Sequence, residues 1–272
     1  MTKQYFAGKV AFVTGSSRGI GFATARELGR QGAAVVLNAR GEERLAKARK
    51  ALEDEGLTVA ALQADVASPD ACKAMIDEIV DRFGGLDILV NNAALMMSTG
   101  FETIGPEVYK SMVEVNVLGA IYATRCALPH LKARKGSVVF LSSIAGLVGI
   151  PDMSLYSTTK MALAGLAGSL RCELKPAGVH VGMVYPGFTQ NDPEKRMFGP
   201  GGTLILPGRP PYHTQEQVAK KIATLIRKRK RQMVLTPYGK AVHLMMRVSP
   251  RFVEYVIAQI QYGGLRQRLG VE

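Results

Sequence analysis

Strand-like and helix-like segments alternate regularly along most of this sequence. Short apolar runs rich in β-branched residues occur at 9–14, 33–38, 57–63, 86–90, 137–141 and 180–185. Segments with helical apolar spacing lie between them, at 20–31, 42–55, 71–83, 106–131 and 155–175. This alternation predicts an α/β fold, in which a doubly wound parallel sheet carries helices on both faces.

The order of these segments also predicts the domain organisation. Six strands make two mononucleotide-binding halves, as in a Rossmann fold, and a chain of 272 residues suits one such domain with an extension. Residues 191–211 contain five prolines and four glycines, so we expect no regular element there and interpret 191–213 as a substrate lid. A helix at 215–231 and a last strand at 232–236 complete the predicted domain, residues 1–237. Residues 238–272 form a predicted C-terminal helical tail, with a helix over 238–269.

Composition excludes several other classes of protein. With 47% apolar and 21% charged residues, the chain is neither disordered nor a disulfide-stapled miniprotein. Its three cysteines are far apart and lack metal-ligand spacing, which favours a reducing, cytoplasmic compartment and no metal. The sequence shows no export signal, and its longest uncharged stretch is too short to cross a bilayer.

Positive charge is concentrated near the C-terminus. Residues 209–272 contain 13 Lys and Arg against 3 Asp and Glu. From residue 240 to residue 260, cationic and apolar residues recur at helical spacing, which is typical of an amphipathic helix. Such a helix packs over a pocket or a partner subunit, or lies at an anionic membrane surface, and we slightly favour packing.

A glycine-rich turn follows the first predicted strand, at residues 14–21 (TGSSRGIG). Gly15 allows the tight turn, Gly19 lets the backbone approach a pyrophosphate, and Gly21 lets helix and strand pack closely. The same residues also fit the G-x-S-x-G nucleophile elbow of α/β-hydrolases, with Ser17 as the nucleophile. That alternative lacks a histidine with a recognisable partner and lies on the wrong strand.

A second group of polar residues lies after the fourth predicted strand. Asn116 falls within the long predicted helix, Ser143 follows the fifth strand, and Tyr156 begins the next helix. Tyr156 and Lys160 are four residues apart and therefore share one helical face. An adjacent ammonium favours the phenolate, so we expect the pKa of Tyr156 to be lowered.

These motifs, in this order, resemble the short-chain dehydrogenase/reductase family, and in particular its NADP-preferring carbonyl reductase and hydroxysteroid dehydrogenase-like members. The resemblance covers roughly residues 7–190. It rests on the motif at 14–21, Asp65-Val66, the NNAA motif at 91–94, Asn116, Ser143, the YSTTK motif at 156–160, and Pro186-Gly187.

The resemblance implies a role for each matching residue. Tyr156 exchanges a proton with the substrate oxygen, Lys160 lowers its pKa and holds the nicotinamide ribose, Ser143 bonds the carbonyl, and Asn116 anchors a water relay. The cofactor-binding residues that it implies, together with the two arginines discussed next, are Gly15, Ser17, Arg18, Gly19, Ile20, Gly21, Asn38, Arg40, Asp65, Val66, Asn91, Ala93, Tyr156, Lys160, Pro186, Gly187 and Thr189.

The end of the second strand predicts which dinucleotide is bound. NAD enzymes place an acid there to hold the ribose 2′-hydroxyl, but this chain reads Asn38-Ala39-Arg40. Arg40, together with Arg18 of the glycine-rich turn, suits a 2′-phosphate. We therefore expect NADP as the cofactor.

Apolar residues dominate the expected substrate pocket: Leu95, Met96, Met97, Ile144, Leu147, Val148, Pro151, Met153 and Phe188. The sequence thus predicts an NADP(H)-dependent oxidoreductase, acting on a lipophilic carbonyl or alcohol of lipid or steroid-like type, as a homodimer or homotetramer. One alternative is an epimerase or dehydratase that retains its cofactor. A less favoured one is an NADP-sensing or nucleic-acid-binding protein, suggested by the basic run at 227–231; because that run lacks interleaved aromatics, we expect no nucleic acid.

Overall fold

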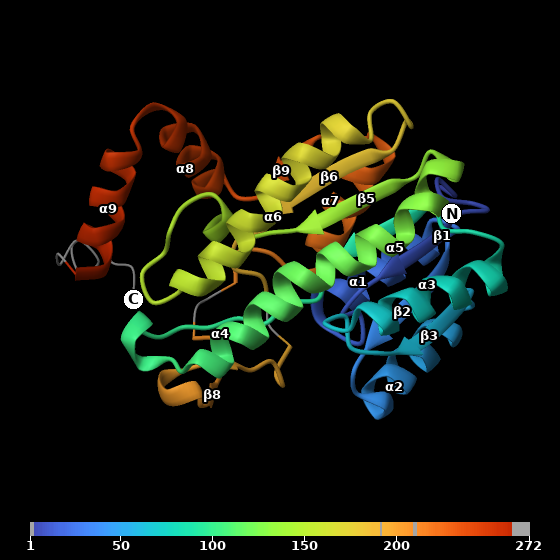
Figure 1. Ribbon diagram of the computed structural model, residues 1–272, viewed down its shortest axis with the longest axis horizontal. Helices are drawn as coiled ribbons and strands as arrows, with labels where there is room; N and C mark the ends of the chain where they lie inside the picture. The colour runs from blue at the N-terminus through green and yellow to red at the C-terminus, as the bar shows by residue number, and fades with distance from the viewer. Residues whose placement is uncertain (1–2, 191, 209–210, 263–272) are drawn as a thin grey trace.

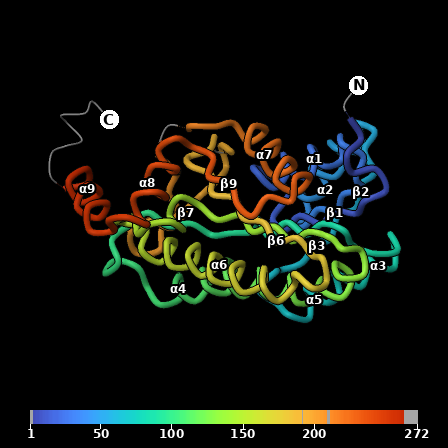
Figure 2. Tube along the Cα trace, turned by 90° about the horizontal axis from the view of Figure 1, so that it is seen from above, coloured from blue at the N-terminus to red at the C-terminus, as the bar shows by residue number. Residues whose placement is uncertain are grey.

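The computed structural model describes residues 3–190, 192–208 and 211–262, and its elements are labelled in Figures 1 and 2. The strands are β1 (Val10–Val13), β2 (Ala34–Ala39), β3 (Val59–Gln63), β4 (Ile88–Asn91), β5 (Ser137–Leu141), β6 (His180–Tyr185), β7 (Met197–Phe198), β8 (Leu204–Ile205) and β9 (Gln232–Val234). The α-helices are α1 (Gly19–Arg30), α2 (Glu42–Glu53), α3 (Pro69–Phe83), α4 (Pro106–Val113), α5 (Gly119–Arg134), α6 (Ser154–Glu173), α7 (Gln215–Arg227), α8 (Pro237–Val248) and α9 (Pro250–Tyr262).

The main sheet is entirely parallel and confirms the predicted fold class. Its strand order is β3-β2-β1-β4-β5-β6-β9, with β9 added beside β6 as a seventh strand. The chain runs from β1 outward to β3 and then returns to β4 on the other side of β1. The crevice between β1 and β4 is therefore a topological switch point, where open α/β sheets bind their ligands.

Helices cover both faces of the sheet, as Figure 2 shows from above. Alternating strand residues point to opposite faces, so Phe12 packs with α3, α5 and α6, whereas Ala11 and Val13 pack with α1, α2 and α7. The helices α1 and α7 pack closely on one face, and α3 and α5 on the other. Strand residues on both faces of the sheet are buried. This packing holds the carboxyl ends of the strands, which line the candidate site, in place.

The predicted helix at 106–131 is interrupted by one π-helical turn. The α-helix α4 passes into π-helical residues Glu114–Leu118 before α5 begins. Asn116 lies in this turn and is buried. Such π-turns frequently occur at functional sites, because the extra residue redirects a side chain.

The prediction that residues 191–211 contain no regular element is wrong in part. Met197–Phe198 and Leu204–Ile205 form a short antiparallel hairpin, closed by a 3-10 turn at Pro200–Gly202. The hairpin is also tied to the loop after β4, because Phe198 exchanges two backbone hydrogen bonds with Met96 and Ser98, at 2.9 and 2.8 Å. The prolines flank these strands and do not interrupt their hydrogen bonds.

The C-terminal tail forms two helices, not one. The break falls at Ser249 and Pro250, because proline cannot donate the backbone hydrogen bond that would continue α8. The predicted helical residues 263–269 lie outside the described residues. Within the described part of the chain, no helix is both long and apolar enough to cross a membrane.

The basic run at 227–231 has a structural use. The Arg229 guanidinium donates hydrogen bonds to the carbonyl oxygens of Lys135 and Gly178, at 3.1 and 2.5 Å. The Arg227 guanidinium lies 4.1 Å from the centroid of the Tyr5 ring. Two of these cations therefore tie the end of α7 and the turn after it to neighbouring segments.

Candidate functional site

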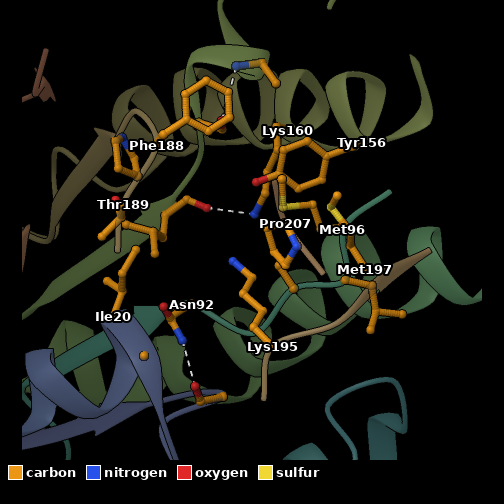
Figure 3. Close-up of a pocket in the computed structure, with 18 of the residues that line it drawn as sticks. Ile20, Asn92, Met96, Tyr156, Lys160, Phe188, Thr189, Lys195, Met197 and Pro207 are labelled. Carbon is orange, nitrogen blue, oxygen red and sulfur yellow. Dashed lines mark hydrogen bonds between the residues drawn. The ribbon is translucent and has the colours of Figure 1, made fainter. Parts of the chain in front are cut away.

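A cavity of about 1150 Å³ opens at the carboxyl ends of the strands (Figure 3). Nearly all the residues expected to form the site line it: Gly15, Ser17, Arg18, Gly19, Ile20, Gly21, Asn38, Arg40, Asp65, Val66, Ala93, Ser143, Tyr156, Lys160, Pro186, Gly187 and Thr189. Of the expected catalytic and cofactor-binding residues, only Asn91 and Asn116 do not line its wall. Figure 3 shows Tyr156 and Lys160 on one side of this cavity, and Ile20 and Asn92 on another.

The glycine-rich turn presents bare backbone to the cavity. Gly19 has a φ of +63°, which strongly favours glycine, and a Cβ at this position would meet no atom within 4 Å. The first turn of α1 begins beside it, and Arg18 at the N-cap supplies no side-chain acceptor. Its free N–H groups and the positive end of the helix dipole therefore face open space, which fits the pyrophosphate of a dinucleotide.

Two asparagines fix the shape of this turn. The Asn38 carboxamide accepts a hydrogen bond from Gly15 N at 3.3 Å, and donates to the carbonyl oxygens of Leu62 and Ala64 at 3.2 and 3.1 Å. The Asn92 carboxamide donates to the carbonyl oxygens of Thr14 and Gly15, at 2.8 and 2.9 Å. Asn38 therefore lines the cavity while its polar atoms are committed to holding the turn.

The structure favours Asn92 over Asn91 as the residue next to the cavity. Asn91 is the last residue of β4, is buried, and donates to Thr124 Oγ1 at 2.9 Å. The next residue points the other way, because side chains alternate along a strand. The strand period was the signal in the sequence that could have identified Asn92.

Arg18, in the glycine-rich turn, and Arg40, directly after β2, line one part of the cavity. We call this part the adenine end, because the end of β2 is where such folds bind the adenosine ribose of a dinucleotide. Arg18 Nη1 is 3.7 Å from Asp192 Oδ1, and Arg40 Nη1 is 3.6 Å from Asp65 Oδ2. Both pairs are longer than hydrogen bonds, and Arg18 Nη1 is buried without a hydrogen-bond partner. Both guanidiniums therefore retain donors for an additional anion.

Tyr156 and Ser143 face one another where α6 begins. Ser143 caps the 3-10 turn Ile144–Gly146, and its hydroxyl also hydrogen-bonds the Tyr156 phenol. Burial raises the pKa of Tyr156 to about 12, and the bond from Ser143 opposes this only in part. The direction is opposite to the one expected from the sequence, so the phenol of the protein without ligand is protonated at neutral pH.

Lys160 explains this difference. Its Nζ donates to the Leu141 carbonyl oxygen at 3.0 Å and lies 5.6 Å from the centroid of the Tyr156 ring. Burial, with the Lys195 ammonium as a second cause, lowers the pKa of Lys160 to about 7. The ammonium is thus directed to a backbone carbonyl and is itself destabilised, so it does not favour the phenolate.

Asn116 lies behind this group and does not reach the cavity wall. Its carboxamide hydrogen-bonds the backbone of Leu95 and donates to Thr159 Oγ1 at 3.0 Å. Leu95 lines the cavity, and Thr159 precedes Lys160 on α6. The geometry therefore places Asn116 as a clamp between α6 and the loop after β4.

The outer part of the cavity is largely apolar, as expected. Of the nine predicted pocket residues, Leu95, Met96, Ile144, Pro151, Met153 and Phe188 line it. Met97 is instead buried in a small core with α4, and Leu147 and Val148 pack beneath the tail. Ile257 and Ile260 of α9 complete the lining, so the tail forms part of the pocket wall.

Lys195 is a cavity residue that the sequence did not reveal. It lies in the proline- and glycine-rich segment, where no periodicity indicates which side chains point inward. Its position depends on how the lid folds back over the glycine-rich turn.

The hydrolase alternative lacks the histidine that it requires. Within the described residues, none of the four histidines hydrogen-bonds Ser17. Both ring nitrogens of His180 are occupied, by Ser137 Oγ at 3.2 Å and the Lys230 carbonyl oxygen at 2.9 Å. The ring of His243 bonds Gln232. Among the described residues, Ser17 therefore has no histidine hydrogen-bonded to it as a general base.

Comparisons with known proteins agree with this geometry. Residues 9–198 match the family described as short chain dehydrogenase. The chain is 32% identical over 259 residues to 11-beta-hydroxysteroid dehydrogenase 1A of Arabidopsis thaliana, covering 91% of this chain and 74% of that one. It is 35% identical over 225 residues to 3-dehydrosphinganine reductase of Danio rerio, covering 78% and 67%. A solved short chain dehydrogenase from Burkholderia cenocepacia J2315, in complex with NADP, has a TM-score of 0.75 and 30% identity, covering 87% of this chain and 99% of that one. The chain therefore belongs to the short-chain dehydrogenase family of oxidoreductases.

Proposed function

We propose that this protein is an NADP(H)-dependent oxidoreductase that reduces the carbonyl group of a lipophilic molecule. One observation carries the proposal. The Ser143, Tyr156 and Lys160 cluster lies on the wall of the same cavity into which the bare glycine-rich turn opens. A bound nicotinamide dinucleotide supplies the hydride for such a reaction, and this chain supplies the proton and orients the substrate.

In this proposal Tyr156 and Ser143 bind the substrate oxygen together. Both hydroxyl groups donate hydrogen bonds to the carbonyl oxygen, which polarises the C=O bond. As negative charge develops on that oxygen, Tyr156 transfers its phenolic proton. Lys160 holds the nicotinamide ribose, and Asn116 fixes the helix that carries both Lys160 and Tyr156.

The protonation state of Tyr156 fits its role as the proton donor in this reaction. Burial raises the pKa of the phenol to about 12, so it carries its proton at neutral pH. Oxidation of an alcohol needs the phenolate instead, so the reverse reaction should gain from alkaline conditions.

The choice of NADP follows from the cations at the adenine end. No acid occupies the end of β2, and Arg18 and Arg40 both line the cavity there. The NADP complex of the Burkholderia relative supports the same choice.

The substrate class follows from the apolar lining. Methionine, proline, phenylalanine and isoleucine side chains surround the region beside Tyr156. The hydroxysteroid dehydrogenase and 3-dehydrosphinganine reductase relatives are named for lipophilic substrates, which agrees with this lining. A panel of steroid, long-chain and short polar ketones, followed by NADPH oxidation at 340 nm, tests the proposal. Turnover confined to the polar ketones would overturn the lipophilic assignment.

An epimerase or dehydratase with the same cluster is the alternative. Such an enzyme recycles its cofactor within each turnover and retains it through purification. Released cofactor in the perchloric acid supernatant of the pure protein, without net NADPH oxidation on the whole panel, would favour this alternative.

The tail suggests where the enzyme acts. One face of α8 and α9 packs against the domain, where Val242 and Val253 form a small core with Val148. The other face exposes Leu244, Val248 and Phe252 beside Arg247 and Arg251. We propose that this face contacts an anionic lipid surface on the cytoplasmic side, from which an apolar substrate reaches the cavity.

We further propose a homodimer or homotetramer, which sedimentation velocity would test.

A further inference from the structure

Lys195 extends from the lid into the open part of the cavity. Figure 3 shows its side chain between Ile20 and Asn92 on one side and Tyr156 and Lys160 on the other. No acidic side chain in the described part of the chain forms an ion pair with its ammonium. Burial and the nearby Arg18 guanidinium lower the pKa of Lys195, and Asp192 opposes this only in part.

Three cations therefore face one open space. Lys195 interacts with Arg18 toward the adenine end and with Lys160 toward the reacting end. Burial destabilises the ammonium groups of both lysines, and their mutual repulsion adds to this cost. An anion placed among the three cations would offset that repulsion, because each cation would then be attracted to the anion.

Two acidic residues just before Lys195 form ion pairs that hold this part of the lid in position. Asp192 lies 3.7 Å from Arg18, and the Glu194 carboxylate bonds the Arg44 guanidinium. The Lys195 backbone N–H also donates to the Asp192 carbonyl oxygen at 2.9 Å. The turn at 192–195 is thus held against the glycine-rich turn and α2, with its lysine directed inward.

We propose that Lys195 is a cofactor-binding residue carried by the lid, and that its ammonium bonds the pyrophosphate of the dinucleotide from the side opposite to the glycine-rich turn. This inference rests on the proposed function. The pyrophosphate is the group that joins the adenine end to the nicotinamide end, and Lys195 lies between the residues that mark these ends. The 2′-phosphate belongs with Arg18 and Arg40, at the end of β2.

Two fragment ligands separate the phosphate groups. ADP-ribose contains the pyrophosphate but no 2′-phosphate, whereas adenosine 2′-monophosphate contains the 2′-phosphate and no 5′-phosphate. Isothermal titration calorimetry should compare both fragments, and NADPH, on the wild type, Lys195→Met, Lys195→Arg and Lys220→Met. Lys220 is an exposed lysine of α7 outside the cavity, so its substitution controls for the loss of one positive charge.

We expect Lys195→Met to weaken the binding of ADP-ribose and of NADPH about 10-fold, because charge-assisted hydrogen bonds are the strong ones, and to change the binding of adenosine 2′-monophosphate by less than about 2-fold. Lys195→Arg should recover most of this loss, and Lys220→Met should match the wild type. Unchanged binding of ADP-ribose to a Lys195→Met protein with a wild-type melting temperature would overturn this inference and leave the proposed function standing. A loss confined to adenosine 2′-monophosphate would do the same. A wild type that binds neither fragment nor NADPH would overturn the proposed function as well.

Discussion

The Asn116 carboxamide pairs with both backbone polar groups of Leu95: its Oδ1 accepts from Leu95 N at 2.7 Å, and its Nδ2 donates to Leu95 O at 2.9 Å. The same Nδ2 donates to Thr159 Oγ1 at 3.0 Å. This side chain is buried, so its removal leaves unpaired polar groups without access to water.

Asn116→Ala should therefore lower the free energy of unfolding by about 2–3 kcal/mol, and kcat should fall as Tyr156 and Lys160 lose their support. Thr159→Val removes one of these three bonds, together with the bond that Thr159 Oγ1 donates to the Tyr156 carbonyl oxygen at 2.9 Å, and should cost about 1–2 kcal/mol. Urea unfolding followed by circular dichroism measures both variants. A loss below about 0.5 kcal/mol for Asn116→Ala would show that the pairing contributes little.

Tyr156→Phe should lower kcat at least about 100-fold, because it removes the proton donor and keeps the ring. The dissociation constant for NADPH should change little. The matched control is Tyr255→Phe, which removes the same hydroxyl from an exposed position on α9. Turnover retained in a folded Tyr156→Phe protein would reject Tyr156 as the donor.

Lys160 gives the cofactor-free protein a stability that depends on pH. The pKa of Lys160 is lowered to about 7 in the folded state, while the unfolded chain keeps its proton up to about 10.5. Between pH 7 and pH 9 the unfolded state therefore binds more protons, and the free energy of unfolding should rise with pH, by at most about 1.4 kcal/mol per unit from this group. Tyr156, whose pKa is raised, opposes stability only above about pH 10.

Urea unfolding of Lys160→Met at pH 7, 8 and 9 should show a flatter rise than the wild type. Lys220→Met should follow the wild type. Parallel curves for the wild type and Lys160→Met would mean that Lys160 is charged in the folded protein at neutral pH.

The arginines at the end of β2 and in the glycine-rich turn should decide the choice of dinucleotide. We expect kcat/KM for NADPH to exceed that for NADH, and Arg18→Ser with Arg40→Ser to reduce the NADPH value at least about 10-fold while the NADH value stays nearly constant. Steady-state kinetics with a ketone that the panel identifies would measure both. Equal values for the two dinucleotides in the wild type would contradict the assignment.

The exposed face of the tail should bind anionic membranes. The wild type should co-sediment with phosphatidylserine-containing vesicles more than with phosphatidylcholine vesicles, and about 0.5 M NaCl should release it. Val248→Ser with Phe252→Ser should weaken this binding, because both side chains are exposed and lie outside the core. Deletion of the tail is a poorer test, since α9 also lines the cavity.

Phe101→Ser, on another exposed apolar residue, controls for a general loss of surface apolarity. Equal sedimentation of wild type with charged and neutral vesicles, or none at low salt, would end the membrane proposal and leave the tail as a wall of the pocket.

Local residue patterns were enough to predict the sheet and most of the site. Strand and helix periods, and the glycines after β1, determine which strand ends meet, because parallel strands place their carboxyl ends at one edge. Ser143, Tyr156, Lys160 and the residues of the glycine-rich turn therefore come together as the sequence predicted.

Tertiary structure alone decided what depends on burial and on the path of the lid. The pKa of Tyr156 is raised because desolvation outweighs the hydrogen bond from Ser143, while the Lys160 ammonium is directed to a backbone carbonyl, and no sequence spacing contains that balance. Lys195 enters the cavity because Asp192 and Glu194 meet arginines that precede them by about 150 residues or more. The tail forms one small core with the domain because the break at Pro250 lets Val242 of α8 and Val253 of α9 both pack with Val148, and Val248 and Phe252 stay exposed.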